Sequence, residues 1–397
     1  MKKIFFVVCV IFSLMACNNN NLSNSFKIMG LVENAKDGEK IVLSYYTLQN
    51  EEWYKTVDTT EIINGKFVFT GHIDNLTAAY LVFDEPTNVV IDIQIYLEPT
   101  TMKLRINKSI PYAYILEGTK VEKESLELRK ILDPYNRFYH DFLLQEDDLV
   151  TQIQQNEADS LLCDSLNHEL FKLRDEFKRT VTTSFNLYET YLGFISKHKN
   201  YRIVPDLISA LPVDTARSIF NSLPESSKTS LMGRLALKQL EKKENEQKSQ
   251  ANSLVGCFAP DFTREDAEGK TIRLSDFKDQ SVVLLDFWAS TCGPCIKKIP
   301  DIINLHDKYG NKGLVVIGIS EDTDRADWLN AIEKFQLNQW SQILSIRDKT
   351  ILFDNDVIGD LYAVQFIPSY ILIDKQGKIA ARWVGAIDED LLQKLIR

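Results

Sequence analysis

The sequence predicts a multidomain protein with an N-terminal all-β, sandwich-like domain, a helical middle region and a C-terminal α/β domain. At 397 residues, the chain exceeds the roughly 250–300 residues at which a single hydrophobic core stops growing. The spacing of the apolar residues also changes twice, near residues 118 and 253, from short runs to helical stripes and then to alternating strand and helix patterns. The composition, 44% hydrophobic and 26% charged, is typical of a folded protein.

Residues 1–17 have the pattern of a lipoprotein signal peptide. Lys2 and Lys3 precede an apolar run at residues 4–15 that is too short to cross a bilayer comfortably. The Leu-Met-Ala-Cys sequence that ends at Cys17 resembles the bacterial lipobox, which implies that Cys17 is lipidated and becomes the first residue of the mature protein. The polar residues 18–25 are then a tether. The alternatives are a secretory peptide with an incidental Cys and an uncleaved anchor.

These features predict a protein of a bacterial cell envelope, lipid-anchored to a membrane and facing the periplasm. The net charge is −10, with Lys and Arg scattered among Asp and Glu. We therefore expect no basic patch that could neutralise phosphates, and no nucleic-acid partner. Cys9 leaves with the signal peptide, and the thiols that remain besides the lipidated one are Cys163, Cys257, Cys292 and Cys295.

Residues 26–118 are predicted to form the β domain. Their short apolar runs lie at residues 41–46, 66–73, 79–83, 89–97 and 102–106. Asn64-Gly65 stands between the apolar stretches 61–63 and 67–69, and this dipeptide indicates a hairpin turn.

Residues 119–253 are predicted to be a helical region with a linker. One stripe of helical spacing consists of Leu128, Ile131, Tyr135, Phe138 and Phe142, and a second consists of Val181, Phe185, Tyr188, Leu192 and Ile195. The charged run at 238–250 indicates a solvated helix end or linker, and we expect the boundary near Ser253.

Residues 254–397 alternate between apolar runs typical of strands and apolar stripes of helical spacing. We expect strands at 282–288, 314–319, 370–373 and 379–384, and helices at 292–309, 326–335 and 388–396. The resulting order is strand, helix, strand, followed after a further helix by two strands and a helix.

The Cys-Gly-Pro-Cys motif at residues 292–295 lies where the first strand gives way to a helix. In an exported protein such a pair is a structural bridge, half of a metal site or a redox centre. A helix that begins just after Cys292 puts this sulfur at the positive end of the helix dipole, which lowers a thiol pKa. Cys295 lies one turn deeper, and Pro294 in the first turn costs no helical hydrogen bond. Asp286, in an apolar strand, is an expensive buried charge unless it accepts a proton.

The stretch at residues 284–295, Leu-Leu-Asp-Phe-Trp-Ala-Ser-Thr-Cys-Gly-Pro-Cys, closely resembles the active-site segment of thioredoxins. Residues 259–262 and 274–277 resemble the entry segment of the envelope-anchored TlpA/ResA type. Residues 63–71 resemble the domain of unknown function that precedes thioredoxin modules in Bacteroidetes envelope proteins. The C-terminal resemblance covers residues 254–397 and implies a thioredoxin-like fold.

The resemblance also implies roles for individual residues. It makes Cys292 the attacking thiol, Cys295 the resolving thiol, Asp286 the buried carboxylate and Pro368 the cis-proline. From the placement of Asp286 on an apolar strand, we take it as the base that deprotonates Cys295. The active-site loop then contains Trp288, Thr291, Gly293 and Pro294. Thr291 departs from the family, which usually has Trp at this position to shield the sulfur, so substrate preference and redox potential need not follow the family.

Two other chemistries are disfavoured. A zinc site needs two further ligands at metal spacing, but the five His residues are dispersed and no second Cys-x-x-Cys exists. A peroxidase of the related peroxiredoxin type needs Thr three residues before its Cys, where this chain has Ala289. We expect no metal and no cofactor beyond the Cys292–Cys295 disulfide. Cys163 and Cys257 are expected to be non-catalytic, with a bridge between them left open.

The sequence thus predicts a protein thiol-disulfide oxidoreductase that contributes to redox homeostasis in the envelope. Gly-Pro between the cysteines is the dipeptide of reducing thioredoxins, which favours reduction of protein disulfides. A reductant in an oxidising compartment must be recharged, so the resemblance implies a membrane thiol electron donor. Cytochrome c maturation is the family's best-known use, and nothing in the sequence selects it. The alternative is a lipid-anchored binding or sensing protein in which the thioredoxin module is a scaffold.

Overall fold

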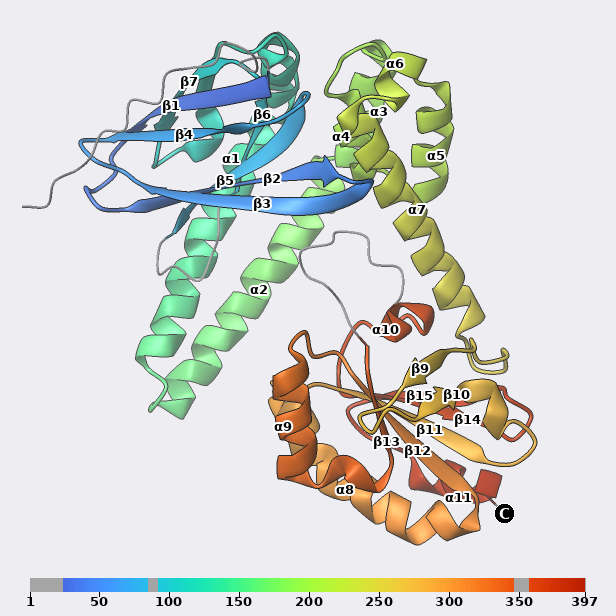
Figure 1. Ribbon diagram of the computed structural model, residues 1–397. Helices are drawn as coiled ribbons and strands as arrows, with labels where there is room; N and C mark the ends of the chain where they lie inside the picture. Colours follow the sequence, from blue (N-terminus) through green and yellow to red (C-terminus); the bar gives the residue numbers. More distant parts are fainter. Residues whose placement is uncertain (1–23, 85–91, 346–356, 397) are drawn as a thin grey trace, which may run out of the picture. The chain divides into compact units, whose positions relative to one another are not determined.

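The computed structural model describes residues 24–84, 92–345 and 357–396 (Figure 1). These residues form two compact units, one with the chain up to Leu43 and Asp58–Leu170, the other with Ser44–Val57 and the chain from Phe171 onward. A β region, a helical region and an α/β domain follow one another, as the sequence predicts. The predicted signal peptide and Cys17 lie outside the described residues. Of the helices in the described ranges, none combines the length and the apolar character needed to span a bilayer.

The β region contains two four-stranded sheets (Figure 1). The strand order is β4-β1-β7-β8 in the first sheet and β3-β2-β5-β6 in the second. The first sheet buries one face: along β1, Phe26, Ile28 and Val32 are buried and alternate with exposed residues. The strands of this region are β1 (Ser25–Glu33), β2 (Lys40–Gln49), β3 (Glu52–Glu61), β4 (Lys66–His72), β5 (Thr77–Asp84), β6 (Ile93–Leu97), β7 (Thr101–Asn107) and β8 (Ile115–Glu117).

The Asn64-Gly65 turn forms, but the hairpin around it does not. Both residues have positive φ, 51° and 70°, and Ile63 and Lys66 exchange two backbone hydrogen bonds of 2.9 and 3.0 Å. Yet β3 pairs with β2 and β4 pairs with β1, so this turn carries the chain from one sheet to the other. A local turn signal fixes the turn, whereas the pairing partner is fixed by which apolar faces meet in the core.

The helical region is built from α1 to α7. The first predicted stripe lies within α1, but the second is divided between two helices. The side chain of Asn186 accepts a hydrogen bond from Glu189 N (3.1 Å) and starts a new helix there. The charged run at 238–250 is the second half of a long helix. The bounds are α1 (Glu122–Gln155), α2 (Ser160–Ser184), α3 (Leu187–Lys197), α4 (Val204–Leu207), α5 (Val213–Ser222), α6 (Glu225–Lys228) and α7 (Leu231–Asn252).

The α/β domain contains a five-stranded sheet of order β13-β12-β11-β14-β15 (Figure 1). β11 is parallel to β12 and antiparallel to β14. Every strand and helix predicted for residues 254–397 is present, and the short elements β9, β10, β13 and α10 are additional. The bounds are β9 (Thr263–Glu265), β10 (Thr271–Arg273), β11 (Val282–Trp288), α8 (Gly293–Tyr309), β12 (Leu314–Ser320), α9 (Arg325–Phe335), β13 (Ser341–Leu344), α10 (Ile358–Leu361), β14 (Ser369–Ile373), β15 (Ile379–Val384) and α11 (Glu389–Ile396).

Strand β11 is buried on both faces because a separate core covers each one. Val282, Leu284 and Trp288 pack in one core with Cys295 of α8. Val283, Leu285 and Phe287 pack in the other, together with Tyr362. Successive side chains of a strand alternate between faces, so Asp286 points to the face that α8 covers.

Candidate active site

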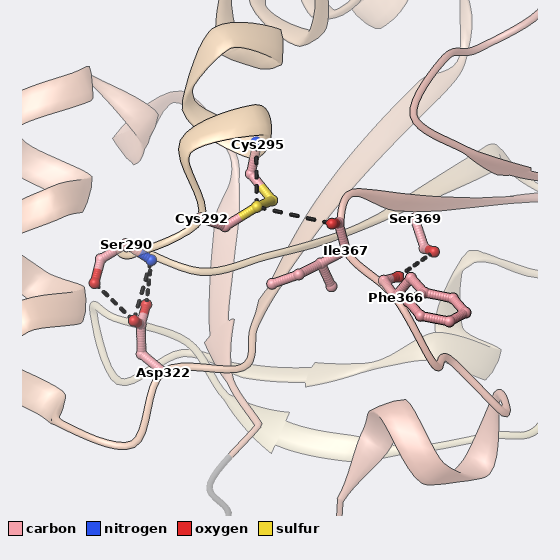
Figure 2. Close-up of a disulfide and its surroundings, with 7 residues drawn as sticks. All are labelled: Ser290, Cys292, Cys295, Asp322, Phe366, Ile367 and Ser369. Atoms are coloured by element: carbon pink, nitrogen blue, oxygen red, sulfur yellow. Dashed lines mark hydrogen bonds between the residues drawn. A yellow bond between two sulfur atoms is a disulfide. The ribbon is translucent and has the colours of Figure 1, made fainter. Parts of the chain in front are cut away.

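The two cysteines of the motif form a disulfide at the start of α8 (Figure 2). Their sulfurs are 2.02 Å apart. Cys292 is the N-cap residue, and the backbone N–H of Cys295 donates to its Sγ at 3.2 Å. Cys292 is partly exposed, whereas Cys295 is only 4% exposed. One sulfur therefore faces potential partners and the other is shielded beneath it.

The residues next to Cys292 in the sequence are exposed. Thr291, Gly293 and Pro294 are all exposed, and Gly293 and Pro294 form the first turn of α8. Free backbone N–H groups and the helix dipole both stabilise a thiolate at a helix N-terminus. The reduced Cys292 is thus placed to act as a nucleophile near neutral pH.

Asp286 is buried under α8, at 8% exposure. Burial raises its pKa from 3.8 to about 7, because a charged carboxylate loses hydration in the core. Its direct partner in the register of β14 is Tyr370, which is also buried and whose pKa burial and Asp286 raise. A carboxyl with a pKa near neutrality can both accept and return a proton at neutral pH.

Trp288 is held in place by a residue that the sequence did not single out. Its Nε1 donates to Oε1 of Gln342 at 3.2 Å, and the Gln342 amide donates to Leu337 O at 3.1 Å. Gln342 reaches Trp288 by lying across Gly318, where a Cβ would come within 2.1 Å of the amide oxygen. Trp288 thus serves as a buried support beneath the active-site loop.

A second unpredicted group, Asp322, fastens the loop between β11 and Cys292 (Figure 2). Its carboxylate accepts from Ser290 N at 2.9 and 3.0 Å and from Ser290 Oγ at 2.7 Å. It also accepts from Ser320 Oγ at 2.7 Å, and it is 6% exposed. These four hydrogen bonds compensate the buried carboxylate for its lost hydration. They also fix the backbone two residues before Cys292.

The segment before β14 closes the other side of the disulfide (Figure 2). The Ile367–Pro368 peptide bond is cis. The carbonyl oxygen of Ile367 lies 3.8 Å from Cys292 Sγ, close enough to accept from this group as a thiol. The carbonyl of the preceding Phe366 accepts from Ser369 Oγ at 2.5 Å, and the Phe366 side chain is 69% exposed.

The other two cysteines of the described residues take no part in this disulfide. Cys163 and Cys257 are both free, so the bridge left open between them is absent. The thiol of Cys163 donates to Asn156 O at 3.1 Å, and that of Cys257 to Ala251 O at 3.6 Å. Within the described ranges, no group of three or more His, Cys, Asp or Glu residues is arranged to hold a metal ion.

Comparisons with known proteins agree with this geometry. A family model described as the AhpC/TSA family matches residues 255–382. A second, described as a domain of unknown function (DUF4369), matches residues 26–124. The thiol-disulfide oxidoreductase ResA of Bacillus thuringiensis strain Al Hakam is 34% identical over 144 residues, which are 36% of this chain and 77% of that protein. The ResA protein of Bacillus cereus strain ZK/E33L is 33% identical over 139 residues, 35% of this chain and 75% of that one.

The chain belongs to the ResA-type family of thiol-disulfide oxidoreductases. Its C-terminal domain is thioredoxin-like, and the protein is a thiol-disulfide oxidoreductase by family. The solved thioredoxin domain of a thiol-disulfide oxidoreductase from Bacteroides vulgatus is similar to 36% of this chain and 99% of that chain, at 31% identity and a TM-score of 0.32. A thiol-disulfide oxidoreductase from Bacteroides fragilis is similar to 35% of this chain and 96% of that chain, at 34% identity and a TM-score of 0.30.

Proposed function

We propose that this ResA-type protein reduces disulfides of other proteins through the Cys292–Cys295 dithiol, in the bacterial cell envelope. The observation that carries the proposal is the asymmetry of the two sulfurs: Cys292 is partly exposed at the N-terminus of α8, and Cys295 is buried behind it. The Gly-Pro dipeptide between them favours the reducing direction.

The reaction proceeds by two thiol-disulfide exchanges. The thiolate of Cys292 attacks one sulfur of a substrate disulfide, so that bond breaks, a mixed disulfide forms and one substrate thiolate leaves. Asp286 takes the proton of Cys295. The Cys295 thiolate then attacks Cys292 Sγ, which releases the second substrate thiolate and leaves the Cys292–Cys295 disulfide. Two electrons pass to the substrate, and a membrane-bound dithiol donor must return them before the next cycle.

Insulin reduction by the purified full-length protein, with Cys17→Ser to keep it unacylated, tests the activity. With dithiothreitol as the electron source, we expect precipitation of the insulin B chain, and we expect it to be lost in the additional Cys292→Ser variant. A folded protein with no activity above the dithiothreitol background would instead support the binding or sensing alternative, with the thioredoxin module as a scaffold.

The location rests on Cys17, and it has a separate test. The two or three acyl chains of the proposed lipid anchor give stable membrane attachment, whereas a single acyl chain gives only marginal binding. Cys17→Ser should therefore move the protein from the membrane fraction to the soluble fraction when lysed cells are fractionated at high salt, which weakens any purely electrostatic attachment. Unchanged membrane fractionation of the variant, with its signal peptide shown to be cleaved, would contradict the lipid anchor.

A further inference from the structure

The outward face of the β4-β1-β7-β8 sheet has an unusual composition. Burial alternates along β1, β4 and β7, so one set of side chains fills the core and the other faces outward. Four of the outward residues are large and apolar, with exposures of 37%, 37%, 48% and 54%: Met29, Leu31, Val68 and Ile115. An ordinary solvated sheet face places polar residues at such positions.

The strand register brings basic side chains between these apolar ones. Met29 lies beside Val68 on one side and Lys103 on the other. Two residues further along β1, the neighbours of Leu31 are Lys66 and Arg105, and Arg105 in turn adjoins Ile115. The basic members of this basic-apolar face are Lys27, Lys66, Lys103 and Arg105, all exposed.

The charge of this face is opposite to that of the whole chain. Among its strand residues the acidic members are Glu33, at the end of β1, and Glu117, opposite Lys103, whereas the whole chain carries −10. The exposed end of β3, in the other sheet, carries Asp58 and Glu61 instead. Our expectation that the chain has no basic patch is therefore wrong: residues far apart in the sequence are gathered by strand pairing.

We propose that the basic-apolar face lies on the surface of a bilayer with anionic headgroups. Apolar side chains that alternate with Lys and Arg suit the boundary between acyl chains and headgroups, because the apolar groups insert while the cations meet lipid phosphates. β1 begins at Ser25, and the eight Cα-to-Cα steps from Cys17 to Ser25 can span at most about 27 Å. The face thus lies within reach of a membrane to which Cys17 is anchored, a step that rests on the proposed lipidation.

Vesicle binding of the unacylated mature chain with Cys17→Ser tests the face independently of the lipid. We expect this protein to sediment with vesicles of phosphatidylcholine and phosphatidylglycerol, to bind them less at high salt, and not to sediment with phosphatidylcholine alone. The triple variant Lys27→Glu/Lys103→Glu/Arg105→Glu should lower the partition coefficient by roughly tenfold or more. Met29→Ser/Leu31→Ser should lower it as well, without any change of charge.

A matched control carries the same charge change on the helices: Lys130→Glu/Lys172→Glu/Lys178→Glu, at exposed positions of α1 and α2. We expect the control to lose less than half as much of the vesicle partition coefficient as the face variant loses. Circular dichroism checks that both proteins are folded. Equal losses in both triple variants, or equal binding of the parent to charged and neutral vesicles, overturns the proposal. Self-association that the face variants abolish, without any vesicle binding, would assign the face to a second copy of the chain and overturn it too.

Discussion

The sheet that contains β11 and the β4-β1-β7-β8 sheet depart in opposite ways from the usual pattern, in which apolar residues are buried and charged residues are exposed. In the C-terminal sheet every residue of β11 is buried, including the carboxyl of Asp286. In the N-terminal sheet the outward face displays apolar side chains such as Met29 and Val68. A buried carboxyl lowers the stability of the fold. An exposed apolar patch lacks the stabilisation that burial of its side chains would give. Folding alone explains neither, so the first departure indicates chemistry and the second indicates contact with another surface.

The largest expected effect tests the difference between the two sulfurs. Cys295→Ser should accumulate covalent mixed disulfides with envelope proteins, because the exposed Cys292 still attacks while nothing resolves the adduct. Cys292→Ser should accumulate few and lose all activity. Non-reducing electrophoresis of both variants after acid quenching measures this. Equal trapping by the two variants, or none by either while both are folded, would mean that the catalytic assignment is wrong.

Asp286→Asn should slow release of the mixed disulfide by about 100-fold near neutral pH, since the buried base for Cys295 is gone. The first attack by Cys292 should keep its rate. Stopped-flow reduction of a fluorescent disulfide separates the two steps across pH 6 to 8. If the wild type and Asp286→Asn release substrate equally fast over this range, Asp286 is not the base.

The same substitution should change how stability depends on pH. The pKa of Asp286 is about 7 in the folded protein against 3.8 ordinarily, so between these values the folded state binds more protons than the unfolded state. The free energy of unfolding should therefore fall as the pH rises from 4 to 8, by at most about 4 kcal/mol. Asp286→Asn should lack this loss. Urea unfolding at several pH values measures it, and parallel curves for the two proteins would contradict the raised pKa.

A change in the N-terminal sheet should act on stability without touching the chemistry. In Gly30→Ala the new Cβ comes within 2.0 Å of the Phe67 ring, and such overpacking costs about 1–3 kcal/mol. Gly193→Ala, in α3, meets nothing within 4 Å and serves as the control. We expect the first to lower the unfolding midpoint and the second not to, with insulin reduction unchanged in both. Loss of reduction in a folded Gly30→Ala protein would show that the two regions are coupled.

The sequence predicts the C-terminal domain almost residue by residue, since its signals are local. A continuous apolar run sets β11, and the Cys-x-x-Cys motif sets the start of α8. Where partners lie far apart in the sequence, the same reasoning fails. Nothing near Trp288 points to Gln342, and nothing near Ser290 points to Asp322, because strand register alone brings them together.

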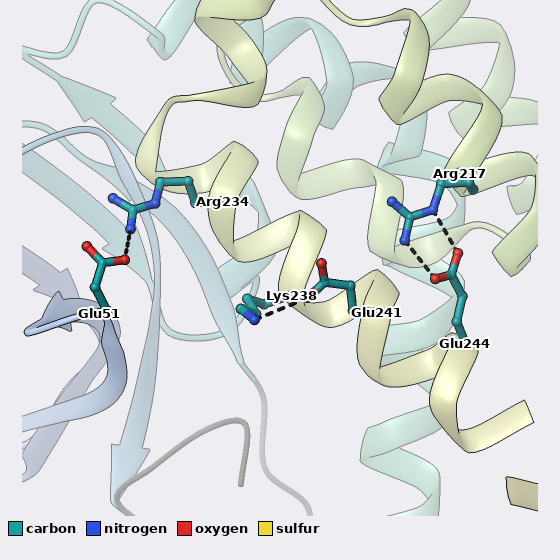
Figure 3. A network of polar contacts seen from close by, with 6 residues as sticks. All are labelled: Glu51, Arg217, Arg234, Lys238, Glu241 and Glu244. Carbon is teal, nitrogen blue, oxygen red and sulfur yellow. Dashed lines mark hydrogen bonds and ion pairs between the residues drawn. The ribbon is translucent and has the colours of Figure 1, made fainter. Parts of the chain in front are cut away.

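The charged run at 238–250 gave an ambiguous prediction for a similar reason. It is helical. Two ion pairs join α7 to residues outside the helix, and a third joins two residues within it (Figure 3). The two-pronged pair joins Arg217 to Glu244, with both hydrogen bonds at 2.7 Å. The others join Arg234 to Glu51 at 2.7 Å and Lys238 to Glu241 at 3.2 Å. Surface pairs of this kind add about 0–1 kcal/mol each, and a composition that is polar throughout does not reveal them.

The smallest expected effect concerns the loop that Asp322 fastens. In Asp322→Asn the amide can still accept from Ser290 N, but its NH2 group cannot accept from Ser320 Oγ, so at least one buried hydrogen bond is lost at a cost of about 1–3 kcal/mol. If the backbone at Ser290 is held less firmly, Cys292 is less well aligned with the start of α8.

We therefore expect insulin reduction and the alkylation rate of reduced Cys292 to fall by a similar factor, roughly two- to tenfold. Asp324→Asn is the matched control, since Asp324 also accepts backbone hydrogen bonds, from Ala326 and Asp327, but at the exposed start of α9. Iodoacetamide kinetics at fixed pH compare the two variants. If Asp322→Asn loses stability while Cys292 keeps its full alkylation rate, the cluster supports the fold of this domain without positioning the attacking sulfur.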